Sequence, residues 1–311
     1  MGSTHMDFIA YMESFPKPGQ TVTALSYASS PGGKGANQAV TVAKLGARSH
    51  FVSRVGRDFV GDTLIQNLRK QQVFTDNVTM DPRDNSGVAL IYVDASGENM
   101  IAVAPGVDHQ IVPRDIEESR DMFSRSRVVL CQLEIPLETV EHAMRLGRKI
   151  GAVTILNPAP ATPLPAKLLE YVDLLTPNRI ELEALSGTLV ESDKDIIDSA
   201  HVLIAQGVKH VVVTLGERGA MIVDESEHLK VPGLKVEVVD TVGAGDAFNG
   251  ALAVGLSMGE NMLEAVSFAN LVAAIKVTMR GAQAGLPTLS QVIEFSRTRR
   301  LPGIPRSFSQ A

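Results

Sequence analysis

The segment from Asp240 to Gly250, Asp-Thr-Val-Gly-Ala-Gly-Asp-Ala-Phe-Asn-Gly, contains the residue types that handle a phosphoryl group. Gly243 and Gly245 can take backbone conformations closed to other residues, so successive amide N–H groups can converge on one anion where the following apolar helix begins. Phosphoryl transfer requires such charge stabilisation, and also a carboxylate that accepts the proton of the attacking hydroxyl. Asp246 stands beside these amides, where a general base is needed.

The same segment is compatible with a glycine-containing turn in which Asp246 only caps a helix. Two better-known nucleotide-binding patterns are excluded by the residues present. The dinucleotide pattern Gly-x-Gly-x-x-Gly would need glycine where Phe248 stands, and the P-loop needs Gly-Lys-Ser or Gly-Lys-Thr, which the chain lacks. Any nucleotide bound here is held in another way. A strand-like stretch with valines at 236, 238 and 239 is expected to precede the segment.

A second glycine turn runs into a helix between Gly32 and Val40, with the sequence Gly-Gly-Lys-Gly-Ala-Asn-Gln-Ala-Val. A backbone freed by Gly32 and Gly33 can approach sugar hydroxyls closely, and Asn37 offers both a donor and an acceptor. An ordinary helix-entry turn has the same spelling, so this segment alone leaves both interpretations open.

Together, the two segments resemble the signatures of the carbohydrate kinase family that includes ribokinase and adenosine kinase. Gly-Gly-Lys-Gly-Ala-Asn-Gln-Ala and Asp-Thr-x-Gly-Ala-Gly-Asp-x-Phe occur in the family's order, and the resemblance runs from Gly2 to about Pro287. It implies an enzyme that transfers the γ-phosphate of ATP to a small sugar. Shorter matches resemble the ribokinase-type members of the family, and they lie at 14–19, 132–134, 157–160, 176–178 and 214–219. They imply that the acceptor is D-ribose, which is phosphorylated at its 5-hydroxyl.

Other functions remain open beside this one. The same chemistry on deoxyribose, fructose or a nucleoside is the nearest alternative. A binding or regulatory protein that kept the fold without turnover is a second class, and a nicotinamide-dependent enzyme is possible on fold alone.

The resemblance also assigns roles to residues of this chain. It implies an anion hole at Gly243, Ala244 and Gly245, with Asp246 as the base. The residues expected to face the sugar are Asp7, Gly33, Lys34, Gly35, Asn37, Glu134 and Asp246. Those expected to bind ATP are Asn178, Thr214, Gly216, Gly219, Gly245 and Asn270.

Two cations follow from the same resemblance. Mg²⁺ would accompany ATP and be organised indirectly by Glu181, within the element Asn178-x-x-Glu181. A monovalent cation, usually potassium, would act as an activator. Its expected ligands are Asp240 and the backbone at Val242, Lys276, Met279, Gly281 and Gly285.

The spacing of apolar residues predicts the elements that position these segments. Short β-branched runs alternate with helical patterns, which is typical of an α/β fold with a doubly wound, mainly parallel sheet flanked by helices. The expected strands are 51–55, 128–133, 153–156, 172–175 and 211–215. The expected helices are 36–45, 63–71, 136–149, 192–206, 246–256 and 263–278.

A small antiparallel β lid is predicted from the strand-like regions about 8–30 and 86–104, the latter turning around Gly97. Such a lid could cover the carboxyl ends of the parallel strands, where open α/β sheets bind ligands. We expect one kinase domain over 1–300 and a disordered tail over 301–311. Lids of the ribokinase type often pair across a dimer, so the resemblance implies a homodimer.

The start of the chain departs from the family pattern. Gly-Ser-x-Asn-x-Asp normally follows a first buried strand, whereas here Gly2-Ser-Thr-His5-Met-Asp7 has no such strand before it. We expect the first central strand to be missing or replaced. Its loss would expose backbone groups of its neighbours and places the turnover of this form in question.

The composition excludes several partners. The 311 residues are 44% hydrophobic and carry a net charge of −6, with no basic face for nucleic acid. Cys131 is the single cysteine and lies in an apolar run, which favours a buried thiol in a reducing compartment. No apolar run is long enough to cross a membrane and no signal peptide is evident, so we expect a cytosolic location.

Overall fold

The computed structural model describes residues 1–299, so the tail predicted to be disordered lies outside the described residues. The main sheet has six strands in the order β12-β11-β10-β9-β8-β7. Strands β7 to β10 are parallel, whereas β11 and β12 add on in antiparallel fashion. The bounds are β7 Val128–Cys131, β8 Val153–Leu156, β9 Leu174–Leu175, β10 His210–Thr214, β11 Ala220–Val223 and β12 His228–Val231.

Helices cover both faces of this sheet, because successive strand residues point to opposite sides. Ile155 and Val212 pack with α1 (Lys34–Lys44), α9 (Ala244–Ser257) and α10 (Met262–Lys276). Leu156 and Val213 pack with α5 (Leu137–Lys149) and α8 (Asp193–Ile204) on the other face. The predicted doubly wound, mainly parallel sheet is confirmed. Within residues 1–299 we find no helix long and apolar enough to span a membrane.

The remaining helices are short or peripheral. They are α2 Phe59–Lys70, α3 Pro113–Glu118, α4 Arg120–Phe123, α6 Ala166–Leu169, α7 Arg179–Ser186 and α11 Leu289–Arg299, with 3₁₀ turns η1 Gly106–Gln110 and η2 Gly216–Arg218.

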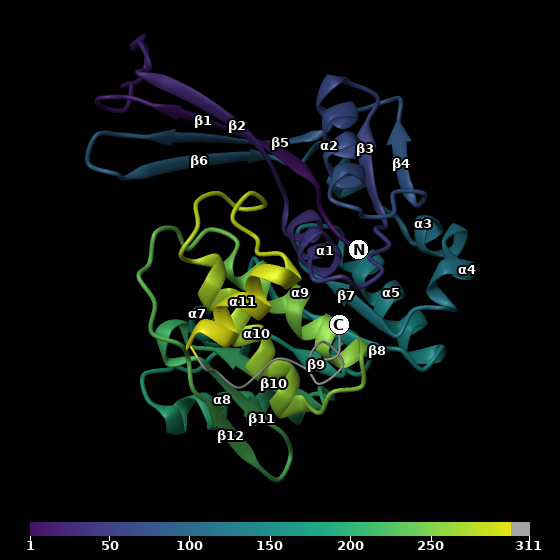
Figure 1. Ribbon diagram of the computed structural model, residues 1–311. Helices are drawn as coiled ribbons and strands as arrows, with labels where there is room; N and C mark the ends of the chain where they lie inside the picture. The colour runs from purple at the N-terminus through teal and green to yellow at the C-terminus, as the bar shows by residue number, and fades with distance from the viewer. Residues whose placement is uncertain (300–311) are drawn as a thin grey trace.

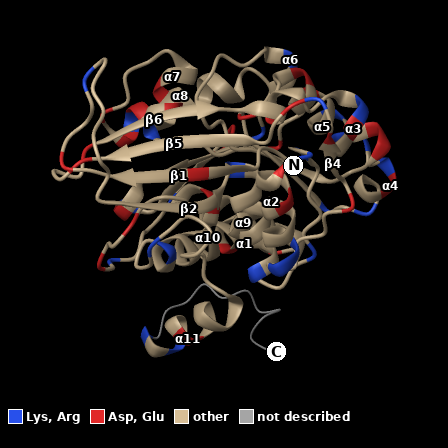
Figure 2. Ribbon diagram, turned by 90° about the horizontal axis from the view of Figure 1, so that it is seen from above, with Lys and Arg blue, Asp and Glu red and all other residues tan. Residues whose placement is uncertain are grey.

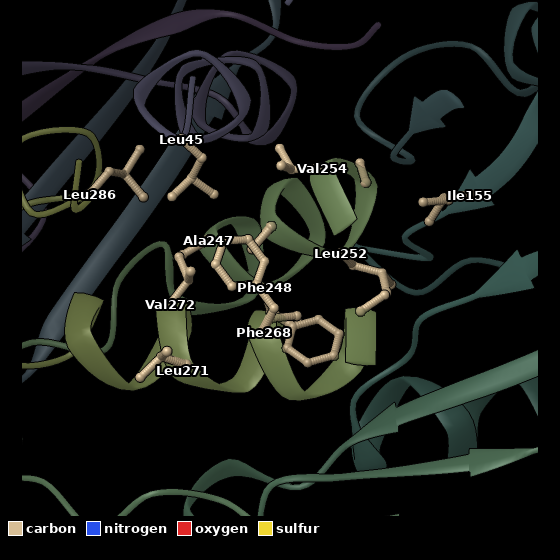
Figure 3. Close-up of a cluster of buried hydrophobic side chains, with 14 of the residues drawn as sticks. Leu45, Ile155, Ala247, Phe248, Leu252, Val254, Phe268, Leu271, Val272 and Leu286 are labelled. Atoms are coloured by element: carbon tan, nitrogen blue, oxygen red, sulfur yellow. The ribbon is translucent and has the colours of Figure 1, made fainter. Parts of the chain in front are cut away.

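Helices α9 and α10 form the centre of the larger apolar cluster. Figure 3 shows Phe248 of α9 and Phe268 of α10 among Leu252 and Val272, and all four side chains are buried. Gly255 permits this close packing, because a Cβ there would lie 3.0 Å from the Cα of Ala265. A helix that is apolar on nearly all sides belongs in the interior. The first turn of α9 is therefore fixed in place by its neighbours.

A second sheet forms the lid, in the order β2-β1-β5-β6, and projects beyond the helices (Figure 1). Its strands are β1 His5–Tyr11, β2 Ser26–Gly32, β5 Gly87–Val93 and β6 Asn99–Ala104. The β1–β2 and β5–β6 pairs are antiparallel, while β1 and β5 run parallel. The strands lie side by side and carry few charged residues (Figure 2). The lid was predicted in these two regions of the sequence.

Strand β3 (Ser53–Gly56) was expected in the main sheet, and this prediction is wrong. It pairs in parallel with β4 (Val78–Asp81) as a separate two-stranded sheet, because no strand within residues 1–299 connects it to β7. The first residues of the chain bridge the two edges. The Met1 amine donates to the Leu130 carbonyl at 2.8 Å, and the Gly2 amide donates to the Val52 carbonyl at 3.2 Å.

Beyond this bridge lies a cavity of about 700 Å³ between the two edges. Its walls come from the segments 47–52 and 125–130, with Ala39 and Val42 of α1 and Ala253 of α9 on one side. Within residues 1–299 no strand occupies this place between β3 and β7, where the first central strand was expected to be missing or replaced. The gap leaves sheet edges unpaired, which is destabilising.

Adding five alternating Val and Ile residues directly before Met1 should raise the melting temperature by about 5 °C, because the added strand can pair with both edges and bury apolar side chains. Differential scanning calorimetry measures the shift. A Gly-Ser extension of equal length is the matched control and should leave the melting temperature unchanged. Equal melting temperatures for the two extensions would show that the gap does not accept a strand.

Three further elements differ from prediction. The stretch before Asp240 is not a strand; Val238 and Val239 are 60% and 49% exposed, so its valines pack against no sheet. Strands β11 and β12, of four residues each, were not predicted.

Candidate active site

The two glycine segments meet where α1 crosses α9. Asp246 lies buried in the first turn of α9, and its two carboxylate oxygens accept hydrogen bonds from Asn37 Nδ2 at 2.9 Å and Gln38 Nε2 at 3.1 Å. The helices approach closely because Gly250 faces α1; a Cβ there would lie 2.5 Å from the Cβ of Thr41. The structure therefore brings Asn37 and Asp246 together, as the sequence predicted.

Burial raises the pKa of Asp246 to about 6. The charge of Lys34 and the hydrogen bonds from Asn37 and Gln38 act in the opposite direction, while the nearby carboxylate of Glu134 adds to the increase. At neutral pH this group is mainly a carboxylate that can still accept a proton, which is the property of a general base.

The turn before Asp246 presents backbone amides at the N-terminus of α9. Gly243 is the N-cap, with φ of 78° in the left-handed region, and Ala244 and Gly245 begin the helix. A Cβ at Gly245 would meet no atom within 4 Å, so there is open space beside this turn. The Ala244 amide donates to the Thr241 carbonyl at 3.1 Å, which closes the turn. The positive end of a helix dipole beside open space favours an anion.

A chain of polar side chains connects this turn to the ends of the parallel strands. Gln38 Nε2 also donates to Asn157 Oδ1 at 3.1 Å, and Asn157 Nδ2 donates to the Thr176 carbonyl at 3.2 Å. Thr176 Oγ1 donates to Asn249 Oδ1 at 2.6 Å. The Nδ2 of Asn249 in turn donates to the Gly245 carbonyl at 2.9 Å. The sequence interpretation missed Gln38, Thr176 and Asn249. For Thr176 the available signal was a polar residue directly after an apolar strand, whereas Gln38 and Asn249 lie within helices α1 and α9.

Glu134 anchors the turn that opens α1. Its Oε2 accepts from the Lys34 amide at 3.0 Å and from the hydroxyl of Ser3. Gly33 has φ of 91°, and a Cβ there would lie 2.8 Å from the Ser3 carbonyl oxygen. Gly35 packs as closely against the backbone of Gly2. Four of the residues predicted to face the sugar thus lie together, namely Gly33, Lys34, Gly35 and Glu134.

Asp7 reaches the same region from β1, beside Gly32. A Cβ at Gly32 would lie 2.6 Å from Asp7 Oδ2. His5 stands between two carboxylates, 3.4 Å from Asp7 Oδ1 and 3.7 Å from Asp108 Oδ2. Burial alone would lower the pKa of His5, but these two acids and nearby Glu134 raise it to about 10. The imidazolium therefore compensates part of the acidic charge around Asp7.

Asn37 has an unused hydrogen-bond acceptor. Its Oδ1 atom is buried and has no hydrogen-bond partner among the described residues, while its Nδ2 is used by Asp246. A buried acceptor without a partner is costly, and a ligand hydroxyl would satisfy it.

The predicted nucleotide residues gather at the ends of β9 and β10. Asn178 and Thr214 form a parallel β-bridge, and the Asn178 side chain accepts from the Glu181 amide at 2.9 Å to cap α7. Burial raises the pKa of Glu181, whereas the Asn178 amide and the charge of Lys34 lower it. Gly216 and Gly219 follow with φ of 60° and 90°.

Asn270 lies farther along the same face. Its Nδ2 donates to the Val231 carbonyl at 3.3 Å and to the Pro232 carbonyl at 3.4 Å, which fixes the loop after β12. A role beside the adenine stays a prediction.

The residues expected to bind a monovalent cation surround Asp240. Its Oδ1 accepts from the Val242 amide at 2.9 Å, and its Oδ2 accepts from the Gly281 amide at 2.7 Å. Burial would raise the pKa of Asp240, but these amides and Lys276 lower it. Lys276 is fully buried, and its Nζ donates to the carbonyls of Asp240 at 3.0 Å and Met279 at 3.2 Å.

Comparison with known proteins defines the class. The model of the pfkB family of carbohydrate kinases matches residues 1–289, so the chain belongs to this family of sugar kinases. It is 36% identical to a ribokinase of Haemophilus influenzae, over 95% of this chain and 96% of that protein. It is 37% identical to a deoxyribokinase of Salmonella typhi, over 95% and 97% respectively. The structure of Arabidopsis thaliana ribokinase complexed with ribose and ATP superposes with a TM-score of 0.90 at 31% identity, covering 94% of this chain and 96% of that one.

Proposed function

We propose that this sugar kinase transfers the γ-phosphoryl group of ATP to the 5-hydroxyl of D-ribose, giving ribose 5-phosphate and ADP. The observation that carries the proposal is the buried carboxylate of Asp246, held by Asn37 and Gln38 beside the open N-terminus of α9. Ribokinase-named relatives and the Arabidopsis ribokinase with ribose and ATP support ribose as the acceptor.

In this mechanism Asp246 accepts the proton of the sugar hydroxyl. The hydroxyl oxygen forms a bond to the γ-phosphorus, the bond to the β,γ-bridging oxygen breaks, and ADP leaves. The amides of Gly243, Ala244 and Gly245 stabilise the negative charge on the transferred group, because a helix N-terminus favours anions. The charge of Lys34 acts on both Asp246 of the proposed sugar site and Glu181 beside the proposed nucleotide site.

The sugar would be held by the cluster around the first turn of α1. Asn37 Oδ1 supplies an unused acceptor, and the carboxylates of Asp7 and Glu134 supply acceptors for further hydroxyls. Gly33 and Gly35 keep the backbone close to the ligand. ATP would lie along the surface of Asn178, Thr214, Gly216, Gly219 and Asn270.

Mg²⁺ would accompany the phosphates of ATP, as it usually binds through one or two carboxylates plus phosphate and water. The donor set fits such a role, since Glu181 uses one carboxylate oxygen for the Asn178 amide and retains the other. In residues 1–299 no group of three or more acids, histidines or cysteines is arranged so that it could hold a metal ion by itself.

We also propose a cytosolic homodimer of a single kinase domain over residues 1–300, joined through the lid. The lid presents apolar side chains to solvent, an unusual concentration for a free surface. Their exposed fractions are Tyr27 81%, Met100 53%, Ile101 57% and Val103 58%. Sedimentation that finds only monomers at micromolar concentration would overturn this part of the proposal.

The substrate is tested by following ADP formation with ribose, deoxyribose, fructose and adenosine. Ribose with the highest kcat/KM supports the proposal. Deoxyribose is the second candidate, favoured by the similarity to the Salmonella typhi deoxyribokinase; a higher kcat/KM with it would keep the mechanism and replace the acceptor. Ribose binding without ADP formation would indicate a binding protein without turnover.

The pH profile tests the base. Because Asp246 must be ionised to accept a proton and burial raises its pKa to about 6, kcat/KM should be constant above that pH and fall at lower pH. The fall should approach about tenfold for each pH unit. Initial rates between pH 5 and 8 measure it. A profile that stays flat to pH 5 would exclude Asp246 as the titrating base.

A further inference from the structure

The ammonium of Lys276 stands among the oxygens predicted to bind a monovalent cation. Its Nζ lies 3.0 Å from the Asp240 carbonyl oxygen, 3.2 Å from the Met279 carbonyl oxygen and 3.9 Å from Asp240 Oδ2. The side chain is fully buried. The chain thus places its own positive charge at the point where the sequence resemblance implied potassium.

These residues do not fit an additional cation. Potassium can be coordinated by backbone carbonyl oxygens that replace its hydration shell, and here two predicted ligands already accept hydrogen bonds from an ammonium group. Lys carries a compact charge with three donors, which suits the same oxygens. A second positive charge beside Lys276 would be repelled and would have to displace these hydrogen bonds.

We propose that the Lys276 ammonium takes the place of the activating monovalent cation, so that turnover does not depend on potassium. The inference rests on the proposed kinase function. Lys276 does not touch the substrates in this account; it is a positioning residue that acts through Asp240.

The contacts that carry this effect run from Lys276 to the anion hole. The backbone carbonyl of Asp240 accepts a hydrogen bond from the Lys276 ammonium. The Asp240 carboxylate accepts hydrogen bonds from the amides of Val242 and Gly281, at 2.9 and 2.7 Å. Val242 directly precedes Gly243, and a Cβ at Gly243 would lie 3.4 Å from Ala282, the neighbour of Gly281. Both segments that shape the anion hole are therefore tied to the carboxylate beside Lys276.

The first measurement compares kcat of the unaltered protein in potassium chloride and in tetramethylammonium chloride of equal ionic strength. We expect a difference below about twofold, and activation by potassium of about tenfold or more would overturn the proposal. Lys276→Ala removes the ammonium and opens space, so its kcat should fall at least tenfold and recover in part with potassium. Loss of activity that potassium does not restore would also contradict the proposal.

Lys44→Met is the matched control. Lys44 Nζ donates to the carbonyls of Gln283 at 3.1 Å and Leu286 at 2.8 Å, so it likewise binds two carbonyls of the C-terminal loop but does not contact Asp240. Its loss should lower stability without creating a response to potassium.

A second readout needs no turnover. A ligand that binds only the folded state raises the melting temperature, so potassium should stabilise Lys276→Ala selectively and leave the unaltered protein and Lys44→Met unchanged. If the melting data agree with this and no acceptor is phosphorylated, the proposed kinase function fails while the cation site stands. Selective stabilisation of the unaltered protein by potassium would refute the inference itself.

Discussion

Asp246→Asn is expected to lower kcat by about a thousandfold, the effect of removing a positioned base. The amide cannot accept the proton of the sugar hydroxyl, while the size of the side chain is unchanged. The hydrogen bonds can be kept, because Asn37 can rotate its amide and present the unused Oδ1 to the new NH₂ group. The substitution should therefore remove chemistry without removing the fold.

The same substitution should leave the protein more stable at pH 7. A carboxyl that titrates near 6 in the folded state, instead of near its ordinary value of 3.8, is destabilising once ionised, by roughly 2–3 kcal/mol. This cost is absent below about pH 4 and complete above about pH 6. Asp246→Asn should thus raise the free energy of unfolding at pH 7 and lose this advantage at pH 4, measured by urea denaturation.

The control is Asp62→Asn, since Asp62 is an exposed carboxylate in the first turn of α2. It should change neither kcat nor the pH dependence of stability. If Asp246→Asn retains more than about a tenth of kcat, another group accepts the proton. Asp246 would then serve only to join α9 to Asn37 and Gln38 of α1.

The class of enzyme and the local geometry of the candidate site were predictable from sequence, because the two glycine segments encode that geometry. Gly243 takes a positive φ and Asp246 lies at a helix start, and both properties follow from residue order. Strand β8 was predicted with its observed bounds, since its apolar run is buried on both faces.

The directions in which side chains point and their hydrogen-bond partners were less predictable from sequence. Lys276 was assigned through its backbone, and nothing in the order of residues indicates that its ammonium turns toward Asp240. Gln38 reads as an ordinary helix residue, although it connects Asp246 with Asn157. The two contacts of Gln38 span more than a hundred residues and depend on how α1, α9 and β8 are packed.

The gap beside β7 shows the same limit for strands. The run 51–55 has strand character, but its sheet depends on a neighbour that the described chain does not provide. Local preference defines a strand, whereas a partner defines the sheet to which it belongs.

Gly33→Ala should lower kcat/KM for the sugar by about a hundredfold and also destabilise the protein. Two effects destabilise the folded state. A residue other than glycine at a φ of 91° is strained by about 1–3 kcal/mol. The new Cβ would also lie 2.8 Å from backbone atoms of Ser3 and Thr4. Because these are backbone atoms, the turn itself must shift. That shift displaces the Lys34 amide from Glu134 and alters the sugar cluster.

Gly46→Ala separates the two effects. Gly46 follows the other end of α1 with a similar φ of 85°, but its Cβ would meet only the Leu289 side chain, at 3.7 Å. It should lower the melting temperature through backbone strain and leave KM for the sugar unchanged. If steady-state kinetics find the two variants equally active, the close approach of Gly33 to Ser3 is not required by the sugar site. If only Gly33→Ala raises KM, then the close contact at the turn, and not glycine's flexibility alone, shapes the site.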